Sequence, residues 1–334
     1  MMNNLVFQKD RPLDFVAIGR IGLDLNPNEI NRPLEESVTF TKYLGGSPAN
    51  IAVAMAALGA KTGFIGTVAD DAMGRYLKGY MEGKGIDSSS IFTDKTGAKT
   101  GLAFTEIKSP TDCSLIMYRE NAVDLKVDIC HVKEDYIKSA KALLISGTAL
   151  AASPSREAVF AALDLARKND IVVFFDIDYR PYTWKSEEET AIYYSLAAEK
   201  CDVIVGTREE FDMMEMITNK GNKDDYVTAK KWFDFNAKIV VIKHGKEGSI
   251  AYTKEGEAIT GAVFPVVPVK TFGAGDSYAG AFIYGLINGM SVEKSMELGA
   301  GSAAIVVSSH SCSDAMPTLD TIKDFIENYE KKIS

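Results

Sequence analysis

Short stretches of uninterrupted apolar residues recur along the chain and constrain its fold more than any other feature. They cover residues 15–18, 143–145, 171–175, 203–205 and 239–242. None of them alternates with polar residues, which is typical of strands buried on both faces of a parallel sheet. Amphipathic stretches of helical length, such as 155–168 and 187–199, lie between them. Strands that alternate with helices in this way predict a doubly wound α/β layer structure.

The first of these helical stretches follows Ser153 and Pro154. We expect the serine to cap the helix and the proline to occupy its first position, where a missing N–H group costs nothing.

Two regions, about 24–45 and 97–120, break the rhythm of strand and helix. Here apolar and polar residues alternate, as in strands with one face in water. We expect a small β-sheet inserted as a lid in a single domain spanning residues 1–334. An apolar strand face left in water is a liability, so we also expect this sheet to be covered in a homodimer.

Composition and charge exclude several classes of protein. At 334 residues, of which 46% are hydrophobic and 25% charged, the chain can bury a large core. A net charge of −9 and the lack of a basic run argue against a nucleic-acid partner. The first ten residues do not resemble a secretory signal, and no stretch has the roughly 18 apolar residues of a membrane span. The four cysteines are scattered, so we expect a reduced, cytoplasmic protein without a membrane partner.

A glycine-rich turn is the strongest signal of chemistry. Residues 270–277 read Lys-Thr-Phe-Gly-Ala-Gly-Asp-Ser, and a stretch of small and apolar residues typical of a buried helix follows. Free N–H groups at a helix N-terminus bind anions, and glycine lets a phosphoryl group approach closely. We therefore expect an anion hole at Gly273, Ala274 and Gly275, with Asp276 as the catalytic base. A glycine turn merely capped by the aspartate is the alternative.

A second signature makes the turn far more specific. Residues 45–50 read Gly-Gly-Ser-Pro-Ala-Asn and lead into an apolar helical stretch, 51–58, that ends at Gly59. The two signatures, in this order and about 220 residues apart, resemble those of the ribokinase-like (PfkB) carbohydrate kinases. The resemblance implies a three-layer α/β sandwich with a central, mainly parallel sheet and a β-sheet lid. It also implies phosphorylation of a sugar hydroxyl by ATP with Mg²⁺.

The resemblance further implies roles for individual residues. The sugar-binding positions of the family match Asp24, Gly45, Gly46 and Asn50. The positions beside the nucleotide match Lys243, Gly245, Gly248 and Thr271, and the adenine pocket falls near residues 299–308. The family's magnesium-associated Asn-x-x-Glu appears as Thr207 to Glu210, so only Glu210 matches. Glu210 is equally well explained as a first-turn acid that complements the helix dipole.

Two arginines bear on the substrate class. Arg119 leaves the expected lid, and Arg180 lies just past a central strand, where open α/β sheets bind their ligands. A guanidinium suits a carboxylate, so both are predicted to bind an acidic sugar, unless they pair with neighbouring acids such as Glu120 or Asp178.

Within the family, the segments around both arginines and Lys270 resemble members acting on 5-dehydro-2-deoxygluconate in myo-inositol catabolism. Members acting on the isomeric 2-dehydro-3-deoxygluconate are the next alternative. A neutral-sugar kinase and a non-catalytic sugar sensor are more remote ones. A nicotinamide dehydrogenase is disfavoured because Gly19 and Gly22 do not form the dinucleotide fingerprint.

Overall fold

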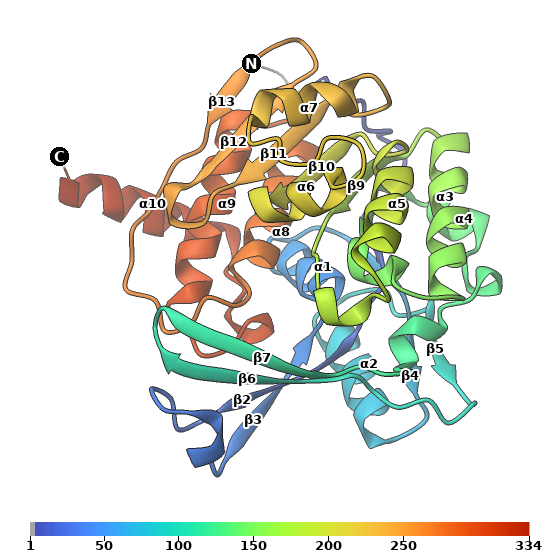
Figure 1. The fold of residues 1–334 in the computed structure, drawn as a ribbon, viewed down its shortest axis with the longest axis vertical. Coiled ribbons are helices and arrows are strands. Elements are labelled where there is room, and N and C mark those ends of the chain that lie inside the picture. Colours follow the sequence, from blue (N-terminus) through green and yellow to red (C-terminus); the bar gives the residue numbers. More distant parts are fainter. Residues whose placement is uncertain (1–3, 334) are drawn as a thin grey trace.

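A large twisted sheet forms the centre of the molecule, in a computed structural model that describes residues 4–333 (Figure 1). Among these residues the sheet has nine strands in the order β13-β12-β11-β10-β9-β8-β1-β4-β5. Its strands are β1 (Leu13–Ile18), β4 (Thr62–Ala69), β5 (Ile91–Asp94), β8 (Ala140–Ser146), β9 (Val172–Asp176), β10 (Val203–Thr207), β11 (Ile239–Lys243), β12 (Ser249–Thr253) and β13 (Ala258–Thr260). Neighbouring strands are parallel except in the pairs β11–β12 and β12–β13, which are antiparallel. All five apolar stretches singled out in the sequence fall on parallel strands of this sheet, except that Ile171 directly precedes β9.

Helices cover both faces of the sheet. The α-helices are α1 (Ser47–Ala57), α2 (Ala72–Gly83), α3 (Glu134–Lys138), α4 (Ser155–Lys168), α5 (Glu187–Ala198), α6 (Arg208–Glu215), α7 (Asp225–Phe233), α8 (Ala274–Ile287), α9 (Val292–Val307) and α10 (Leu319–Ile333). The short 3₁₀ turns are η1 (Leu34–Glu36), η2 (Val123–Lys126), η3 (Ile129–His131), η4 (Gly147–Leu150), η5 (Pro181–Thr183), η6 (Gly245–Glu247) and η7 (Ser313–Ala315). Side chains of α1, α2, α8 and α9 share one apolar core with one face of the sheet, and those of α3 to α7 share a second core with the other.

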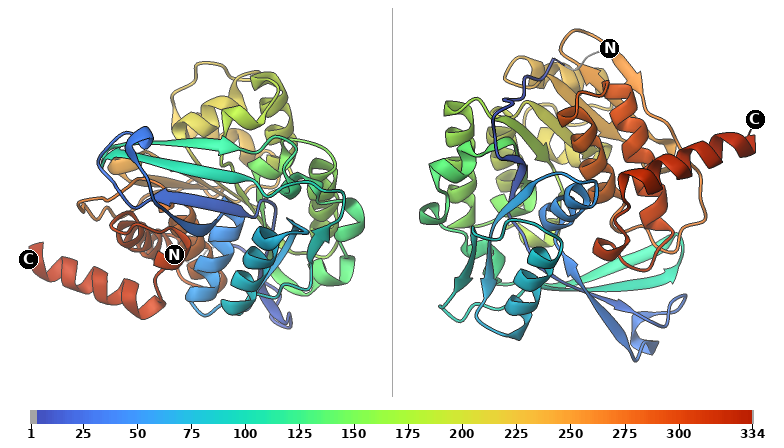
Figure 2. Two further views of the ribbon diagram at one scale, coloured as in Figure 1. Left: turned by 90° about the horizontal axis from the view of Figure 1, so that it is seen from below. Right: turned by 180° about the vertical axis from the view of Figure 1, so that it is seen from behind.

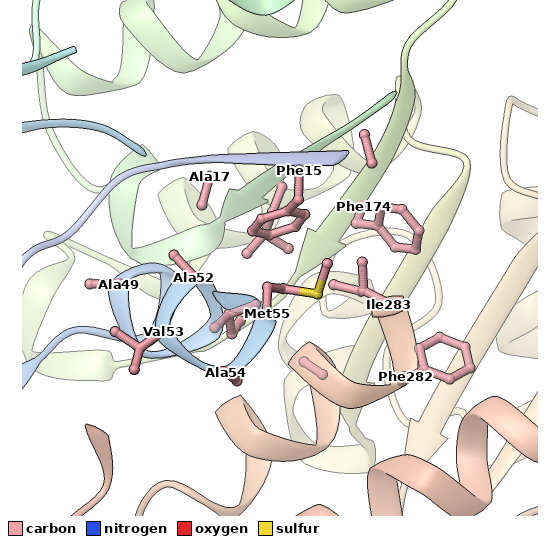
Figure 3. Packing of buried hydrophobic residues seen from close by; sticks show 14 of the residues in the cluster. Phe15, Ala17, Ala49, Ala52, Val53, Ala54, Met55, Phe174, Phe282 and Ile283 are labelled. Carbon is pink, nitrogen blue, oxygen red and sulfur yellow. The ribbon is translucent and has the colours of Figure 1, made fainter. Parts of the chain in front are cut away.

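The first of these cores fixes the two helices that carry the sequence signatures. Phe15 of β1 and Phe174 of β9 lie against Met55 of α1 and Ile283 of α8 (Figure 3). All four side chains are buried, and each such burial stabilises the fold by about 1.5–3 kcal/mol. The N-termini of α1 and α8 are thereby held on the same side of the sheet.

A smaller sheet of four strands, in the order β3-β2-β6-β7, stands off one end of these layers (Figures 1 and 2). It is formed by β2 (Gly22–Pro27), β3 (Phe40–Gly45), β6 (Leu102–Ser109) and β7 (Asp112–Tyr118). Burial alternates along β6 and β7, because one face of the sheet turns toward the body and the other toward solvent. These strands come from the two regions predicted to form a lid.

The predicted fold class is confirmed, with a correction at one helix start. Helix α4 begins at Ser155, and Pro154 is its N-cap rather than its first residue. No cap hydrogen bond comes from a side chain at that position; the hydroxyl of Ser153 donates instead to Glu157 in the first turn.

Two expectations concern the chain as a whole. Within the described part, the four cysteines are free thiols, and no helix combines the length and apolar character that crossing a membrane requires. The expectation about the N-terminal ten residues lies partly outside the description, since residues 1–3 are not covered.

Candidate functional site

A pocket of about 210 Å³ lies where the parallel strands end and the small sheet begins. Asp176, Thr207 and Lys243 reach it from the carboxyl ends of β9, β10 and β11. Open α/β sheets bind ligands at this edge. The small sheet supplies another wall through Thr105 and Met117.

The glycine turn forms one end of this pocket. Gly273, the N-cap of α8, has a left-handed backbone with φ of 84°, which glycine adopts without strain. A Cβ atom added there would lie 2.7 Å from Cys312 Sγ. The N–H of Ser277 donates to the Gly273 carbonyl at 3.0 Å and closes the first helical turn. The N–H groups that precede it in the turn point out of the helix end, where the dipole is positive. We call residues 273–276 the cradle.

Asp276 lies in the first turn of α8, within the pocket wall. Its Oδ2 accepts a hydrogen bond of 2.8 Å from Asn50 Nδ2, in the first turn of α1. Burial and the nearby Asp178 raise the pKa of Asp276, while the Asn50 hydrogen bond lowers it. The two sequence signatures therefore meet at one carboxylate.

A buried ammonium group lies beside the cradle. Lys270 is completely buried, and its Nζ donates to the Phe272 carbonyl at 2.7 Å and to Cys312 Sγ at 3.3 Å. No carboxylate of residues 4–333 lies within ion-pair distance of it. Its charge therefore acts on the turn and on the pocket, where it lowers the pKa of Asp24.

The carboxylates at the strand ends form a second cluster. Asp176 Oδ2 accepts a 2.8 Å hydrogen bond from Ser47 Oγ, and its Oδ1 lies 4.0 Å from Lys243 Nζ. Burial raises the pKa of Asp176, and Lys243 acts in the opposite direction. Asp178, also buried, has a left-handed φ of 40°, which is strained for an aspartate. Strain of this kind concentrates at functional sites.

Glu210 lines the pocket but is also held by the backbone. One of its carboxylate oxygens accepts from the Tyr179 N–H at 3.0 Å and the other from the Thr207 N–H at 2.8 Å. Thr207 and Glu210 thus form a capping box at the start of α6. This geometry matches the capping explanation, and it leaves Glu210 beside the pocket as well.

Asp24 reaches the pocket from the small sheet. Burial raises its pKa to about 6, against the influence of Arg20. Gly45 of β3 pairs with Gly22 of β2, and a Cβ atom on Gly45 would be 1.9 Å from Asp24 Oδ1, so only glycine leaves room for the carboxylate. Gly46 lines the same wall and is the N-cap of α1.

The two arginines singled out in the sequence are both paired. Arg180 lines the pocket, and its Nη2 lies 2.7 Å from Asp178 Oδ1, as in the alternative considered above. Arg119 is buried with Asp124, whose Oδ2 accepts from Nε at 2.9 Å and from Nη2 at 2.5 Å. The acid that binds Arg119 is thus Asp124 and not Glu120. Arg119 is not among the residues of the pocket wall.

Most other predicted residues can be located in or near the same pocket. Lys243 and Thr271 line it, whereas Gly245 and Gly248 lie in the turn after β11, outside its wall. Residues 299–307 belong to α9, which packs on α8.

Several pocket groups were missed in the sequence. They are Arg20, Ser47, Asp176, Asp178 and Cys312. A charged residue just after an apolar strand was the available signal for Arg20, Asp176 and Asp178.

A larger hollow of about 610 Å³ lies at the other end of β11, near Lys238 and Ile239. Its wall includes Glu255, Glu257 and Glu293 and none of the residues of either signature. It faces the amino ends of the parallel strands, where α/β sheets do not place their sites.

Comparisons with known proteins agree with this geometry. The profile of the pfkB family carbohydrate kinases matches residues 13–319. A protein named 5-dehydro-2-deoxygluconokinase from Geobacillus thermodenitrificans (strain NG80-2) is 68% identical over 327 residues, covering 98% of this chain and 97% of the relative. One of the same name from Bacillus thuringiensis (strain Al Hakam) is 62% identical over 332 residues, covering 99% and 100%.

Solved structures share the architecture. A putative ribokinase II from E. coli, crystallised in complex with ATP and Mg²⁺, superposes with a TM-score of 0.84 over 95% of this chain and 99% of that one. The two sequences are 22% identical, so this likeness bears on the fold. Together with the family profile and the two signatures that meet at Asp276, these findings establish that the chain belongs to the PfkB family of carbohydrate kinases.

Proposed function

We propose that this chain transfers the γ-phosphoryl group of ATP to the terminal hydroxyl of 5-dehydro-2-deoxy-D-gluconate, giving the 6-phosphate in myo-inositol degradation. One observation carries the proposal. Asp276, at the N-terminus of α8, shares a single pocket with the arginines Arg20 and Arg180. A base beside an anion-binding turn suits phosphoryl transfer, and guanidinium groups in the same pocket suit an acidic acceptor.

The transfer follows from the positions of these groups. The terminal hydroxyl oxygen of the sugar acid attacks the γ-phosphorus, the bond to the β–γ bridging oxygen breaks, and ADP leaves. Asp276 takes the proton of the hydroxyl, and Asn50 holds that carboxylate in place. The N–H groups of Gly273, Ala274 and Gly275 stabilise the charge on the transferring group, since such reactions depend on positioning and preset electrostatics.

The nucleotide is proposed to lie on the side of Lys243, with Thr271 beside its phosphates. Lys243 Nζ lies next to the cradle, 3.5 Å from where a Cβ atom of Gly275 would stand. Gly245 and Gly248 shape the turn that follows Lys243 and are assigned to the outer part of the nucleotide site.

Magnesium fits this pocket as a partner of the nucleotide. Among residues 4–333 no group of three or more His, Cys, Asp or Glu side chains is arranged to hold a metal ion by itself. Mg²⁺ commonly uses one or two carboxylates, water and substrate phosphates instead. Asp176 and Glu210 are the carboxylates that would face it, and bound magnesium supplies charge neutralisation of the phosphates.

The choice of substrate has two supports. Relatives that cover nearly the whole chain at 62–68% identity carry the name 5-dehydro-2-deoxygluconokinase. The buried guanidinium of Arg20 and the partly exposed one of Arg180 both line the pocket. The isomeric 2-dehydro-3-deoxygluconate has the same charge and is the second candidate.

The small sheet is proposed to act as a lid on a single kinase domain and as a homodimer contact. Leu115 and Met117 of β7 line the pocket, so closure of the sheet would exclude water from the reaction. On the opposite face, Ile116 and Tyr118 are 47% and 64% exposed. A second copy would cover these side chains. Free thiols support a cytoplasmic location.

A panel of acceptors tests the proposal. ADP release is measured with ATP and each of the two keto-deoxygluconates, fructose, ribose and no acceptor. We expect kcat/KM for 5-dehydro-2-deoxy-D-gluconate to exceed every other value by at least about tenfold. Preference for a neutral sugar would contradict the proposed function, and preference for the isomer would redirect it to that acid.

A further inference from the structure

Arg20 is the unusual guanidinium of the pocket. It follows β1 directly, lines the pocket and is only 8% exposed. Its Nη1 contacts Met117 Sδ at 3.6 Å, and its Nε is buried without a hydrogen-bond partner. A thioether sulfur is a weak acceptor, so the charge of Arg20 lacks a matched partner in the free protein.

The neighbouring arginines differ in this respect. Arg180 pairs with Asp178 at 2.7 Å, and Arg119 is bound by Asp124 through two nitrogens, although its Nη1 is unpaired. Arg20 has no carboxylate within 4.0 Å in the described part of the chain. Of the two guanidinium groups in the pocket wall, Arg20 is therefore the one that lacks a carboxylate partner.

Burial without a partner is unfavourable for a guanidinium, because it loses hydration and gains no compensating charge. A fold keeps such a group where a bound anion completes the pair. The planar fork of Nε and the Nη atoms matches the two oxygens of a carboxylate. Burial raises the pKa of Asp24 to about 6, although the charge of Arg20 acts to lower it. Asp24 is therefore only a partial counter-charge for Arg20.

We propose that Arg20 is the residue that binds the substrate carboxylate and sets the preference for acidic sugars; this assignment rests on the proposed function. Arg20 holds the acid group with its unpaired edge. Asp24 accepts hydrogen bonds from the adjacent hydroxyls, and the far end of the sugar then lies toward Asp276. Arg180, tied to Asp178, contributes positive potential from the side. Burial raises the pKa of Tyr182, and the charges of Arg180 and Arg20 both act against this rise, as expected for two cations that face one region.

The test compares an acid with its uncharged isostere. Initial rates are measured with 5-dehydro-2-deoxy-D-gluconate and with its C1 carboxamide, for the unaltered enzyme and the variants R20Q, R20K and R156Q. Arg156 serves as the matched control because it pairs with Glu189 at 2.9 Å and is absent from the pocket wall. Melting temperatures of all variants show whether each is folded.

In R20Q we expect kcat/KM for the acid to fall about 10- to 100-fold, mainly through KM, the range for a lost charged hydrogen bond. For the carboxamide, kcat/KM of R20Q should differ from that of the unaltered enzyme by less than about threefold. R20K should recover part of the loss because it keeps the charge but not the fork. R156Q should keep the acid-to-amide ratio of the unaltered enzyme.

The outcomes separate the two levels of the proposal. An unaltered enzyme that prefers neutral sugars would overturn the proposed function. An acid-preferring enzyme whose R20Q variant loses acid and amide equally would overturn only the assignment of Arg20, since that pattern means that Arg20 merely orients Asp24.

Discussion

The cradle and the arginine-lined end of the pocket are built by different means. The cradle is one continuous segment, residues 273–276, and its proposed binding groups are backbone N–H groups. The other end combines Asp24 from β2 with Arg20 after β1 and Arg180 after β9. Local sequence dictates a turn of the first kind. At the arginine-lined end, the tertiary fold decides which charged side chains pair with each other and which stay free to bind a ligand.

Asp276 is where the two ends must cooperate, and its removal should have the largest effect. In D276N we expect kcat to fall by ~10²–10⁴, the range for a lost general base, because the amide cannot take the proton. Binding of the sugar acid, measured by calorimetry, should change only a few-fold, since the arginine-lined end is intact. Turnover close to that of the unaltered enzyme would remove Asp276 from its role.

Gly273 tests whether the cradle works through its backbone. In G273A we expect turnover to fall up to ~100-fold, because a side chain meets Cys312 and shifts the N–H groups. G289A is the matched control. Gly289 also has positive φ, at 77°, but a Cβ there meets nothing within 4 Å. Both variants should lose about 1–2 kcal/mol of unfolding free energy from left-handed strain. Equal turnover in the two would show that backbone position in the cradle does not matter.

Lys270 separates stability from activity. A buried ammonium without a carboxylate partner carries a desolvation cost that an apolar side chain of similar size does not. We therefore expect K270M to melt at the same temperature or higher. Its kcat/KM should nevertheless fall by about tenfold, because the turn loses the Phe272 hydrogen bond and the pocket loses a charge. A variant with full activity would show that the ammonium serves only packing.

Asp24 gives the smallest effect, a dependence of sugar binding on pH. Its pKa of about 6 in the folded protein lies above its ordinary 3.8, so the side chain is about half ionised near pH 6 and mostly ionised above it. KM for the sugar acid should fall a few-fold as pH rises through this value, because the ionised form accepts hydroxyl hydrogen bonds better.

The same shift affects stability. The folded state binds more protons than the unfolded state between about pH 4 and 6, so stability should decline as pH rises through this window. D24N should flatten both profiles. Unchanged KM and stability profiles in D24N would mean that another group titrates.

The sequence predicted what local patterns encode. Apolar runs without alternation identified the parallel strands, since both faces of such strands are buried. The glycine turn identified the start of α8 and the cradle, because left-handed backbone at Gly273 is a local property. The alternating segments at 24–45 and 97–120 likewise identified the small sheet.

Side-chain pairing across the fold could not be predicted in the same way. Arg119 lies in a promising position, yet its charge is taken by Asp124, five residues further along. Arg20 was not singled out in the sequence, and its lack of a carboxylate partner becomes visible only when Met117 is found beside it. Lys270 was noticed as an unusual residue, but its complete burial depends on the packing around Cys312. For Arg20 and Lys270, a residue remote in the sequence decides the outcome.

The central claim is that the cradle receives the γ-phosphoryl group while the acid end of the sugar binds elsewhere in the same pocket. A crystal structure with a non-hydrolysable ATP analogue and 5-dehydro-2-deoxy-D-gluconate tests it most directly. We predict terminal phosphate oxygens about 3 Å from the N–H nitrogens of Ala274 and Gly275, and the sugar hydroxyl beside Asp276. A terminal phosphate bound away from residues 273–276 would contradict the account.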